Sequence, residues 1–235
     1  MRKKKSLTRM ENERKEKRDK KKLEKRKLPK PMKFVSAEKI VKASRQRSAQ
    51  SIRIKRTQIK YKYLLEKPAE ENKLVVAVRI RGFYGQTTMI KKILHELRLT
   101  TVRSAVFLKM TKRVMYLLKL VEPFVTYGTP TLRVVRDLIT KRAYINLPGQ
   151  QQRSPLNDNA TIEKHLGELN IVCVEDIVNE IWNCGPAFEQ VNKFLEPFKV
   201  ILPPEGYKNK RDTYAEGGDS GDRGEKINDL LQRIL

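Results

Sequence analysis

The sequence predicts an α+β fold with a central β-α-β-α-β unit, a long basic helical extension before it and a helical extension after it. Three observations lead to this prediction. Short apolar segments with strand character lie between residues 74 and 127, amphipathic helical spacing separates them, and Lys and Arg are concentrated before residue 67. The chain therefore consists of a charged first segment and a remainder that is rich in Val, Ile and Leu.

The positive charge is unevenly distributed along the chain. Residues 1–66 contain 26 Lys and Arg against 7 Asp and Glu, whereas residues 67–235 contain 26 against 20. The first segment has too little apolar area to offset its conformational entropy, so it needs a polyanion to become ordered. The net charge of +25 and the pI near 10.1 suit neutralisation of phosphates. These features favour RNA as the partner.

Two basic helices are expected in the first segment. Residues 8–28 begin with a capping box at Thr8 and contain favourable Glu-Lys pairs at i,i+4 spacing. Ser36 is expected to cap a second helix that continues until Pro68. Basic residues occur all around this helix, so it has no stripe for a protein core and is expected to lie along RNA. Its assigned RNA-binding cations are Arg45, Arg47, Arg53, Lys55, Arg56, Lys60 and Lys62.

The central unit is predicted from alternating strand and helix signals. Residues 74–81 form a nearly continuous apolar strand, and Thr87 is expected to cap an amphipathic helix after a glycine-containing turn. Residues 102–109 predict a second strand, Thr111 caps a second amphipathic helix, and residues 124–127 predict a third strand. Right-handed crossovers are expected to place both helices on one face of the sheet.

The last part of the chain, residues 131–235, predicts mainly helices. Leu132 to Ile139 has helical spacing, and a polar loop at residues 148–152 is expected to join two short extended pieces. Further helical patterns cover residues 159–166, 175–183, 187–195 and 227–234. Trp182 is expected to pack in the core on the apolar face of its helix.

Composition argues against membrane-spanning and disulfide-rich classes. The chain has no run of 18 or more apolar residues, and its N-terminus is charged, so it is expected to be soluble and intracellular. Cys173 and Cys184 are expected to be reduced core thiols. A protein that binds an anionic membrane surface is the alternative from a different class, although the apolar residues of 1–30 are too sparse to anchor a helix.

Several segments resemble short catalytic or metal-binding motifs but lack residues that such sites need. The segment 218–221, Gly-Asp-Ser-Gly, lacks the His base and buried acid of a serine protease. The segment 219–225 lacks the alternating ligands of a calcium loop, and His165, Cys173 and Cys184 lack the paired spacing of a zinc site. We therefore expect no catalytic residue, metal, cofactor or small-molecule substrate, and we expect that the protein is not an enzyme.

Cations border the two helices of the central unit as well. Those on or beside the polar faces are Lys91, Lys92, Arg98, Arg103, Lys112 and Arg113. They can meet phosphates while the apolar faces cover the sheet. A solvated side chain is the simpler interpretation of each one alone, and phosphate binding is the interpretation of the set. Tyr61, Tyr63, Phe83 and Tyr84 are expected to pack rather than to stack on bases.

Short motifs between residues 74 and 235 occur together in a characteristic order. They are Val78-Arg79-Ile80-Arg81-Gly82, Leu97-Arg98-Leu99, Val121-Glu122-Pro123, Tyr127-Gly128, Lys141-Arg142, Leu156-Asn157-Asp158-Asn159, Val174-Glu175-Asp176 and Glu216-Gly217-Gly218-Asp219. In this order they resemble the large-subunit ribosomal protein family uL-thirty in its eukaryotic form, L-seven. The basic N-terminal helix is similar to the extension of that family in character rather than in residues.

The resemblance implies a ferredoxin-like β-α-β-α-β core with eukaryotic additions, embedded in large-subunit ribosomal RNA and acting without chemistry. Carried over by position, Arg79, Arg81 and Gly82 match a strand end beside RNA. The other matching basic positions are Lys91, Lys92, Lys109, Lys112, Lys141 and Arg142. Thr88-Met89 stands where the family usually has Pro-Lys, and Ala143 stands where it usually has Gly.

The expected organisation is a basic helical RNA-binding extension at 1–66, a ferredoxin-like core at 67–130, and a helical and loop extension at 131–235 packed on that core. The expected function is that of a structural constituent of the large ribosomal subunit that binds and stabilises its rRNA beside neighbouring ribosomal proteins. Such a protein is cytoplasmic in the ribosome after assembly in the nucleolus. A nucleolar ribosome-assembly factor of the same family, acting in rRNA maturation, is the alternative.

Overall fold

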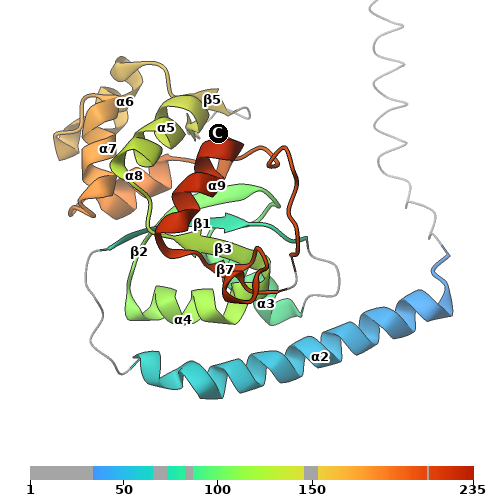
Figure 1. The fold of residues 1–235 in the computed structure, drawn as a ribbon. Coiled ribbons are helices and arrows are strands. Elements are labelled where there is room, and N and C mark those ends of the chain that lie inside the picture. The colour runs from blue at the N-terminus through green and yellow to red at the C-terminus, as the bar shows by residue number, and fades with distance from the viewer. Residues whose placement is uncertain (1–33, 66–72, 83–86, 146–152, 211) are drawn as a thin grey trace, which may run out of the picture. The chain divides into compact units, whose positions relative to one another are not determined.

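The computed structural model of this chain describes residues 34–65, 73–82, 87–145, 153–210 and 212–235 (Figure 1). The chain divides into two compact units, Met1–Val41 and Lys42–Leu235. The helix expected over residues 8–28 lies outside the described residues. The sheet and the buried apolar clusters belong to the second unit.

In the described residues, the centre of this unit is a five-stranded sheet in the order β6-β2-β1-β3-β7 (Figure 1). The strands are β1 Leu74–Arg79, β2 Ser104–Lys109, β3 Val125–Gly128, β6 Phe198–Lys199 and β7 Gly221–Asp222. β1 pairs antiparallel with both β2 and β3, so that Val76 lies opposite Phe107 on one side and Gly128 on the other. β2 and β3 therefore run parallel to each other on either side of β1.

Two amphipathic helices, α3 (Thr88–Glu96) and α4 (Lys112–Val121), cover one face of the sheet. Both predicted caps are present, because the hydroxyls of Thr87 and Thr111 accept hydrogen bonds from backbone amides three residues later. The predicted β-α-β-α-β order is confirmed. The expectation of two right-handed crossovers is corrected, because the β1-α3-β2 connection joins antiparallel neighbours. Within this core, only the β2-α4-β3 connection joins parallel strands.

The C-terminal part of the chain covers the opposite face of the sheet, where its helices form one apolar cluster with Val76, Val78 and Phe107. These helices are α5 Leu132–Arg142, α6 Asn159–Leu166, α7 Val174–Trp182, α8 Phe188–Phe194 and α9 Ile227–Ile234. β4 (Tyr144–Ile145) and β5 (Ser154–Pro155) form the expected pair of short extended pieces. Because both faces of the sheet are covered, every residue of β1 is buried, which explains its continuous apolar sequence.

Short 3-10 helices occur at several element ends, namely η1 Lys62–Leu65, η2 Glu122–Phe124, η3 Gly167–Leu169, η4 Tyr214–Glu216 and η5 Gly224–Lys226. Both cysteines are free thiols, with Cys184 buried and Cys173 half-buried. The prediction for Trp182 is wrong, because 37% of its surface is exposed. It is the last residue of α7, and it lies outside the buried stripe that Val178 and Ile181 form on this helix.

The second basic helix is present as α2 (Ala37–Tyr61). The expectation that it has no packing stripe is corrected, because Ile54 is 3% exposed and belongs to the apolar cluster of α3 and α4. The half-buried residues on the same side are small or polar, among them Ala43, Gln50 and Thr57. One isoleucine among such residues does not produce the apolar periodicity by which packed helices are recognised. Among the described helices, none has the length and apolar character to span a membrane.

Candidate RNA interface

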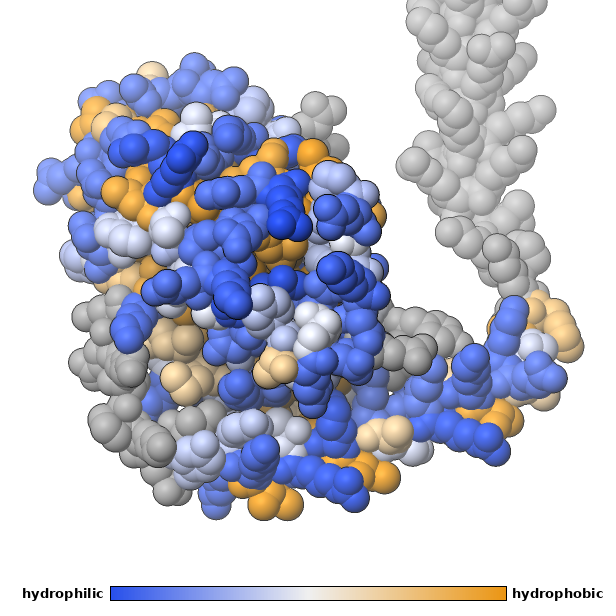
Figure 2. Space-filling view, in the orientation of Figure 1, coloured by the Kyte–Doolittle hydropathy of each residue, from blue (hydrophilic) through white to orange (hydrophobic). Residues whose placement is uncertain are grey.

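The cations of α2 form a dense basic surface. The helix contains eight Lys and Arg and one Glu, with Glu38 in the first turn and Lys60 in the last, where each charge suits the helix dipole. Figure 2 shows hydrophilic side chains along most of this helix. The predicted RNA-binding residues with exposed side chains here are Arg45, Arg47, Lys55, Arg56, Lys60 and, in η1, Lys62.

Arg53 differs from these cations because it anchors α2 to the body of the protein. Its guanidinium donates a hydrogen bond of 2.8 Å to the carbonyl of Leu120 in α4. Burial lowers the pKa of Arg53, nearby Glu122 raises it, and nearby Arg81 lowers it again. Arg53 therefore joins α2 to α4 and brings the helix charge next to the end of β1.

Lys119 makes a second connection between α2 and α4 that the sequence analysis did not identify. Its ammonium lies 3.1 Å from the Glu122 carboxylate, 5.8 Å from the ring centre of Tyr61 and 5.9 Å from that of Tyr127. Burial lowers the pKa of Lys119, but Tyr127 and Glu122 together raise it by more, so the net shift is upward. The i,i+3 spacing of Lys119 and Glu122 was the available signal, but it does not reveal the aromatic partners.

Arg79 is not at the surface, which corrects the placement that the family resemblance implied. It is 0% exposed, and its guanidinium donates hydrogen bonds to the carbonyls of Leu99 (2.9 Å), Thr100 (2.7 Å) and Arg81 (2.9 Å). Burial lowers the pKa of Arg79 to about 10, so the side chain is cationic at neutral pH. The alternation of β1 points Arg79 toward the loop between α3 and β2, whose carbonyls at Leu99 and Thr100 accept two of its hydrogen bonds.

Three more of the predicted cations bind carbonyl groups of the C-terminal part. Arg98 donates to the carbonyls of Asn192 and Leu195, and burial is the main cause that lowers its pKa. Arg142 donates to the carbonyl of Leu235 at 2.7 Å, and Lys109 reaches that of Cys184 at 3.5 Å. Arg98 and Lys109 thus fasten the core to the C-terminal part, Arg142 ties α5 to the end of the chain, and all three half-buried side chains have fewer donors left for RNA.

The other predicted cations lie at the surface of the unit. Lys91 and Lys92 are exposed on α3, and Arg103 is exposed before β2 in a left-handed conformation with φ of 65°. Arg113 pairs with Glu96 at 2.6 Å, and Lys141 pairs with Asp137 at 3.2 Å. Lys112 is half-buried. Exposed ion pairs of this kind are weak and leave these cations able to meet phosphates.

The end of β1 places Arg81 and Gly82 beside a loop of the C-terminal part. Gly82 is exposed, while Arg81 is half-buried with its guanidinium 5.2 Å from the ring centre of Phe124. Arg81 lines a hollow of about 690 Å³ together with Tyr207, Lys208, Asn209, Lys210 and Asp212. These loop cations were missed in the sequence, although the run from Lys208 to Lys210 beside a tyrosine was a local signal.

The segment with protease-like letters has a structural role. Ser220 is buried, and its hydroxyl donates a hydrogen bond of 2.7 Å to the carbonyl of Asp212, which closes the preceding loop. Within the described parts of the chain, no three His, Cys, Asp or Glu side chains are gathered as a metal site would need.

The core of β1, β2 and β3 with α3 and α4 on one face defines a ferredoxin-like α+β protein with a basic helical extension and a helical C-terminal extension. Residues 75–125 match the family described as "Ribosomal protein L30p/L7e". The chain belongs to this family of ribosomal proteins, because relatives at about 40% identity extend the match over most of its length. The predictions of family resemblance and fold class are confirmed.

Three relatives illustrate this similarity, and each is named "Large ribosomal subunit protein uL30". The protein of Dictyostelium discoideum is 40% identical over 201 residues, which cover 86% of this chain and 80% of the relative. That of Yarrowia lipolytica is 41% identical over 201 residues, covering 85% and 79%. That of Caenorhabditis elegans is 38% identical over 202 residues, covering 86% and 81%. These names do not favour the assembly-factor alternative.

Proposed function

We propose that this protein is a structural constituent of the large ribosomal subunit that binds and stabilises the rRNA of that subunit. The observation that carries the proposal is the similarity to large-subunit proteins over more than four fifths of the chain. Neighbouring large-subunit proteins are the other expected partners. Assembly into the subunit in the nucleolus, followed by residence in cytoplasmic ribosomes, belongs to the same proposal.

The exposed cations of α2 are the proposed main contact with RNA. They are distributed around a continuous helix. Arg53 differs from them, because its guanidinium donates a hydrogen bond to the carbonyl of Leu120 in the protein body. Each phosphate that a cation neutralises releases counterions, so this part of the affinity depends strongly on salt. Lys91, Lys92 and Arg103 add exposed positive charge on the globular body.

The proposed contact is tested by replacing Arg45, Arg47 and Arg56 with glutamine in the full-length protein. Glutamine retains helix propensity and removes the charge. The negative slope of log K against log salt is measured with a structured large-subunit rRNA fragment. Its magnitude is expected to decrease by roughly 2 to 3, because each of the three lost phosphate contacts contributes about 0.7 to 0.9. The same variant is expected to enter large subunits less well, as measured by sedimentation with polysomes.

A matched control replaces Lys164, Lys193 and Lys199 with glutamine. These three side chains are exposed on α6, α8 and β6, and their loss changes the net charge by the same amount. The control is expected to change the salt slope by less than half as much. An equal change in both variants would mean that RNA senses only the total charge, and the proposed α2 contact would be wrong.

A further inference from the structure

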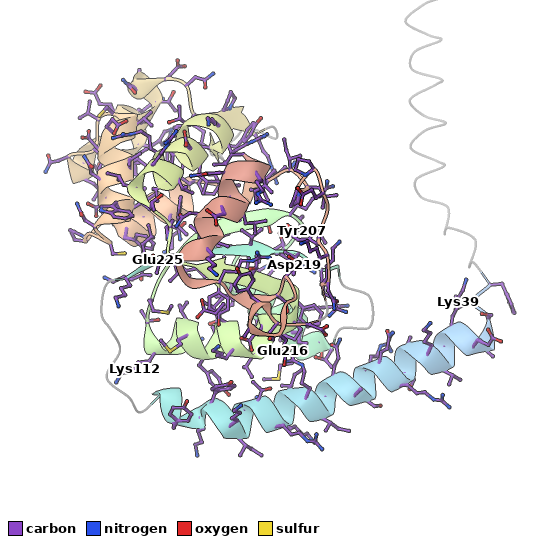
Figure 3. The ribbon with its side chains drawn as sticks, viewed as in Figure 1. Lys39, Lys112, Tyr207, Glu216, Asp219 and Glu225 are labelled. Carbon is purple, nitrogen blue, oxygen red and sulfur yellow. The ribbon has the colours of Figure 1, made fainter. Side chains whose placement is uncertain are left out.

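The loop that precedes β7 and helix α9 enclose a second hollow next to the one at Arg81. It has a volume of about 790 Å³ and is lined by residues 203–208, by residues 214–215 and 217–219, by Arg223 and Lys226, and by Asp229, Leu230 and Arg233 of α9. Tyr207 and Lys208 line both hollows, so the two hollows are adjacent. Figure 3 shows Tyr207 and Asp219 on the segment that runs beside α9.

The two hollows have different chemistry. The larger one has apolar and aromatic walls from Pro203, Pro204, Leu230, Tyr207 and Tyr214. Its charged residues nearly balance, with the cations Lys208, Arg223, Lys226 and Arg233 against the acids Glu205, Asp219 and Asp229. Asp219 is held by Arg223 at 2.7 Å in an ion pair whose side chains are 15% and 9% exposed, respectively. The smaller hollow holds three cations, Arg81, Lys208 and Lys210, against one acid, Asp212. The excess of cations favours an anion in the smaller hollow, whereas the aromatic walls and nearly balanced charges of the larger hollow suit a flat uncharged group.

Cations also lie against the two aromatic rings. The Lys210 ammonium is 5.1 Å from the ring centre of Tyr207, and the Arg223 guanidinium is 4.8 Å from that of Tyr214. Such contacts hold the rings and the basic side chains in fixed relation to each other. The arrangement resembles the combination of stacking surface and positive charge with which proteins bind single nucleotides of RNA.

The hydroxyl of Tyr207 is buried and has no hydrogen-bond partner among the described residues. Burial raises the pKa of Tyr207, so the phenol keeps its proton at neutral pH. A buried donor without an acceptor is rare in native proteins and calls for a partner supplied from outside the chain. Tyr207 itself lines both the aromatic hollow and the cationic one.

We propose that these two hollows form a binding site for one unpaired nucleotide of RNA. The base packs against Tyr207 in the larger hollow, and a flanking phosphate occupies the smaller hollow beside Arg81, Lys208 and Lys210. A volume near 790 Å³ lies within the range of small-ligand sites. A paired base is not able to enter, because its face is stacked within the helix. The proposal rests on the RNA binding proposed above and adds a preference for RNA with an unpaired nucleotide.

The test compares two RNA hairpins that are identical except for one bulged nucleotide, using fluorescence anisotropy with the full-length protein. The wild type is expected to bind the bulged hairpin between about fivefold and 150-fold more tightly, which is the range for stacking one base on an aromatic side chain. Tyr207→Ala is expected to abolish this difference. Lys208→Ala combined with Lys210→Ala is expected to weaken binding of the bulged hairpin more than that of the paired one.

Tyr207→Phe separates binding from folding, because it removes the unpartnered hydroxyl and keeps the ring. Its thermal stability is expected to equal or exceed that of the wild type, because an unpartnered buried hydroxyl is removed, while the preference for the bulged hairpin falls by about two- to tenfold through the lost hydrogen bond. Tyr144→Ala is the matched control, since Tyr144 is a 39% exposed tyrosine on β4, outside both hollows. Photocrosslinking with 4-thiouridine at the bulge is expected to mark the peptide that contains Tyr207.

Equal binding of both hairpins by the wild type would overturn the nucleotide site while leaving the RNA contact of α2 intact. The same conclusion would follow if Tyr207→Ala kept the preference, or if polyglutamate displaced the bulged hairpin as well as the paired one. Failure to bind either hairpin at low salt would contradict the proposed function itself. The two proposals therefore fail in distinguishable ways.

Discussion

Replacing Arg79 with methionine is predicted to destabilise the protein without changing its electrostatic affinity for RNA. Methionine fills a similar space with a flexible apolar side chain but leaves the carbonyls of Leu99, Thr100 and Arg81 without their donor. These carbonyls belong to the loop between α3 and β2 and to the end of β1. The substitution therefore tests whether Arg79 holds the protein together or reaches RNA.

The magnitude follows from how well each carbonyl can be rehydrated. The hydrogen bond to Leu99 is fully buried, so losing it costs about 1–3 kcal/mol, whereas the two partly buried bonds cost about 0.5–1 kcal/mol each. The guanidinium also loses its unfavourable burial, which offsets part of this sum. We expect the free energy of unfolding to fall by about 2–4 kcal/mol, and the melting temperature to fall by about 2–4 °C for each kcal/mol.

Urea unfolding followed by fluorescence of Trp182, the single tryptophan of the chain, measures this change. Arg113→Met is the control, because Arg113 makes an ion pair with Glu96 and its side chain is 75% exposed. Its loss is expected to change the free energy of unfolding by less than about 0.5–1 kcal/mol. Amide hydrogen exchange in residues 98–103 is expected to accelerate in Arg79→Met and to remain unchanged in the control.

The opposite pattern would refute this reasoning. Suppose that Arg79→Met unfolded at the same urea concentration as Arg113→Met but lowered the magnitude of the salt slope of RNA binding by about 0.7 to 0.9, the contribution of one phosphate contact. Arg79 would then bind phosphate directly. The guanidinium would then have to leave its carbonyl partners in the RNA complex.

Three further predictions concern the junction of the core with the C-terminal part. Arg98→Ala removes the donor to the carbonyls of Asn192 and Leu195, so we expect about 1–3 kcal/mol lower stability by urea unfolding and faster hydrogen exchange in α8. Gly128→Ala places a methyl group against the backbone of Gly224, and we expect a lower melting temperature by calorimetry because backbone cannot yield as a side chain does. Burial raises the pKa of Tyr127 from 10.0 to about 12, so the unfolded chain loses this proton at a lower pH than the folded protein. The free energy of unfolding is therefore expected to fall as the pH rises from 10 to about 12. Tyr127→Phe is expected to flatten this decline, as measured by urea unfolding at a series of pH values.

Local signals were sufficient to predict most of the elements. Thr87 and Thr111 cap their helices as expected, because a hydroxyl before an apolar repeat acts through neighbouring backbone amides alone. The strands β6 and β7 were not predicted, since two residues are too few for a periodic pattern and their pairing depends on partners about a hundred residues away. The domain boundaries at residues 66 and 130 remain predictions.

The candidate site was predictable where it depends on charge density and not where it depends on packing. The exposed cations of α2 follow from the composition of one helix. Alternation placed Arg79 on one face of β1 but gave no information on the loop that covers it. The smaller hollow at Tyr207 combines Arg81 with residues more than 120 positions later, which no local pattern encodes.

The two short strands at the sheet margins have a consequence for the nascent chain. β6 and β7 provide the outermost strands beside β2 and β3, and both are encoded near the end of the sequence. Until synthesis reaches Gly221, the backbone amides and carbonyls of β3 face a vacant margin that can recruit a strand from another molecule. Fragments that stop short of β7 are therefore expected to self-associate through this margin, and newly made protein is expected to depend on prompt completion or on a chaperone.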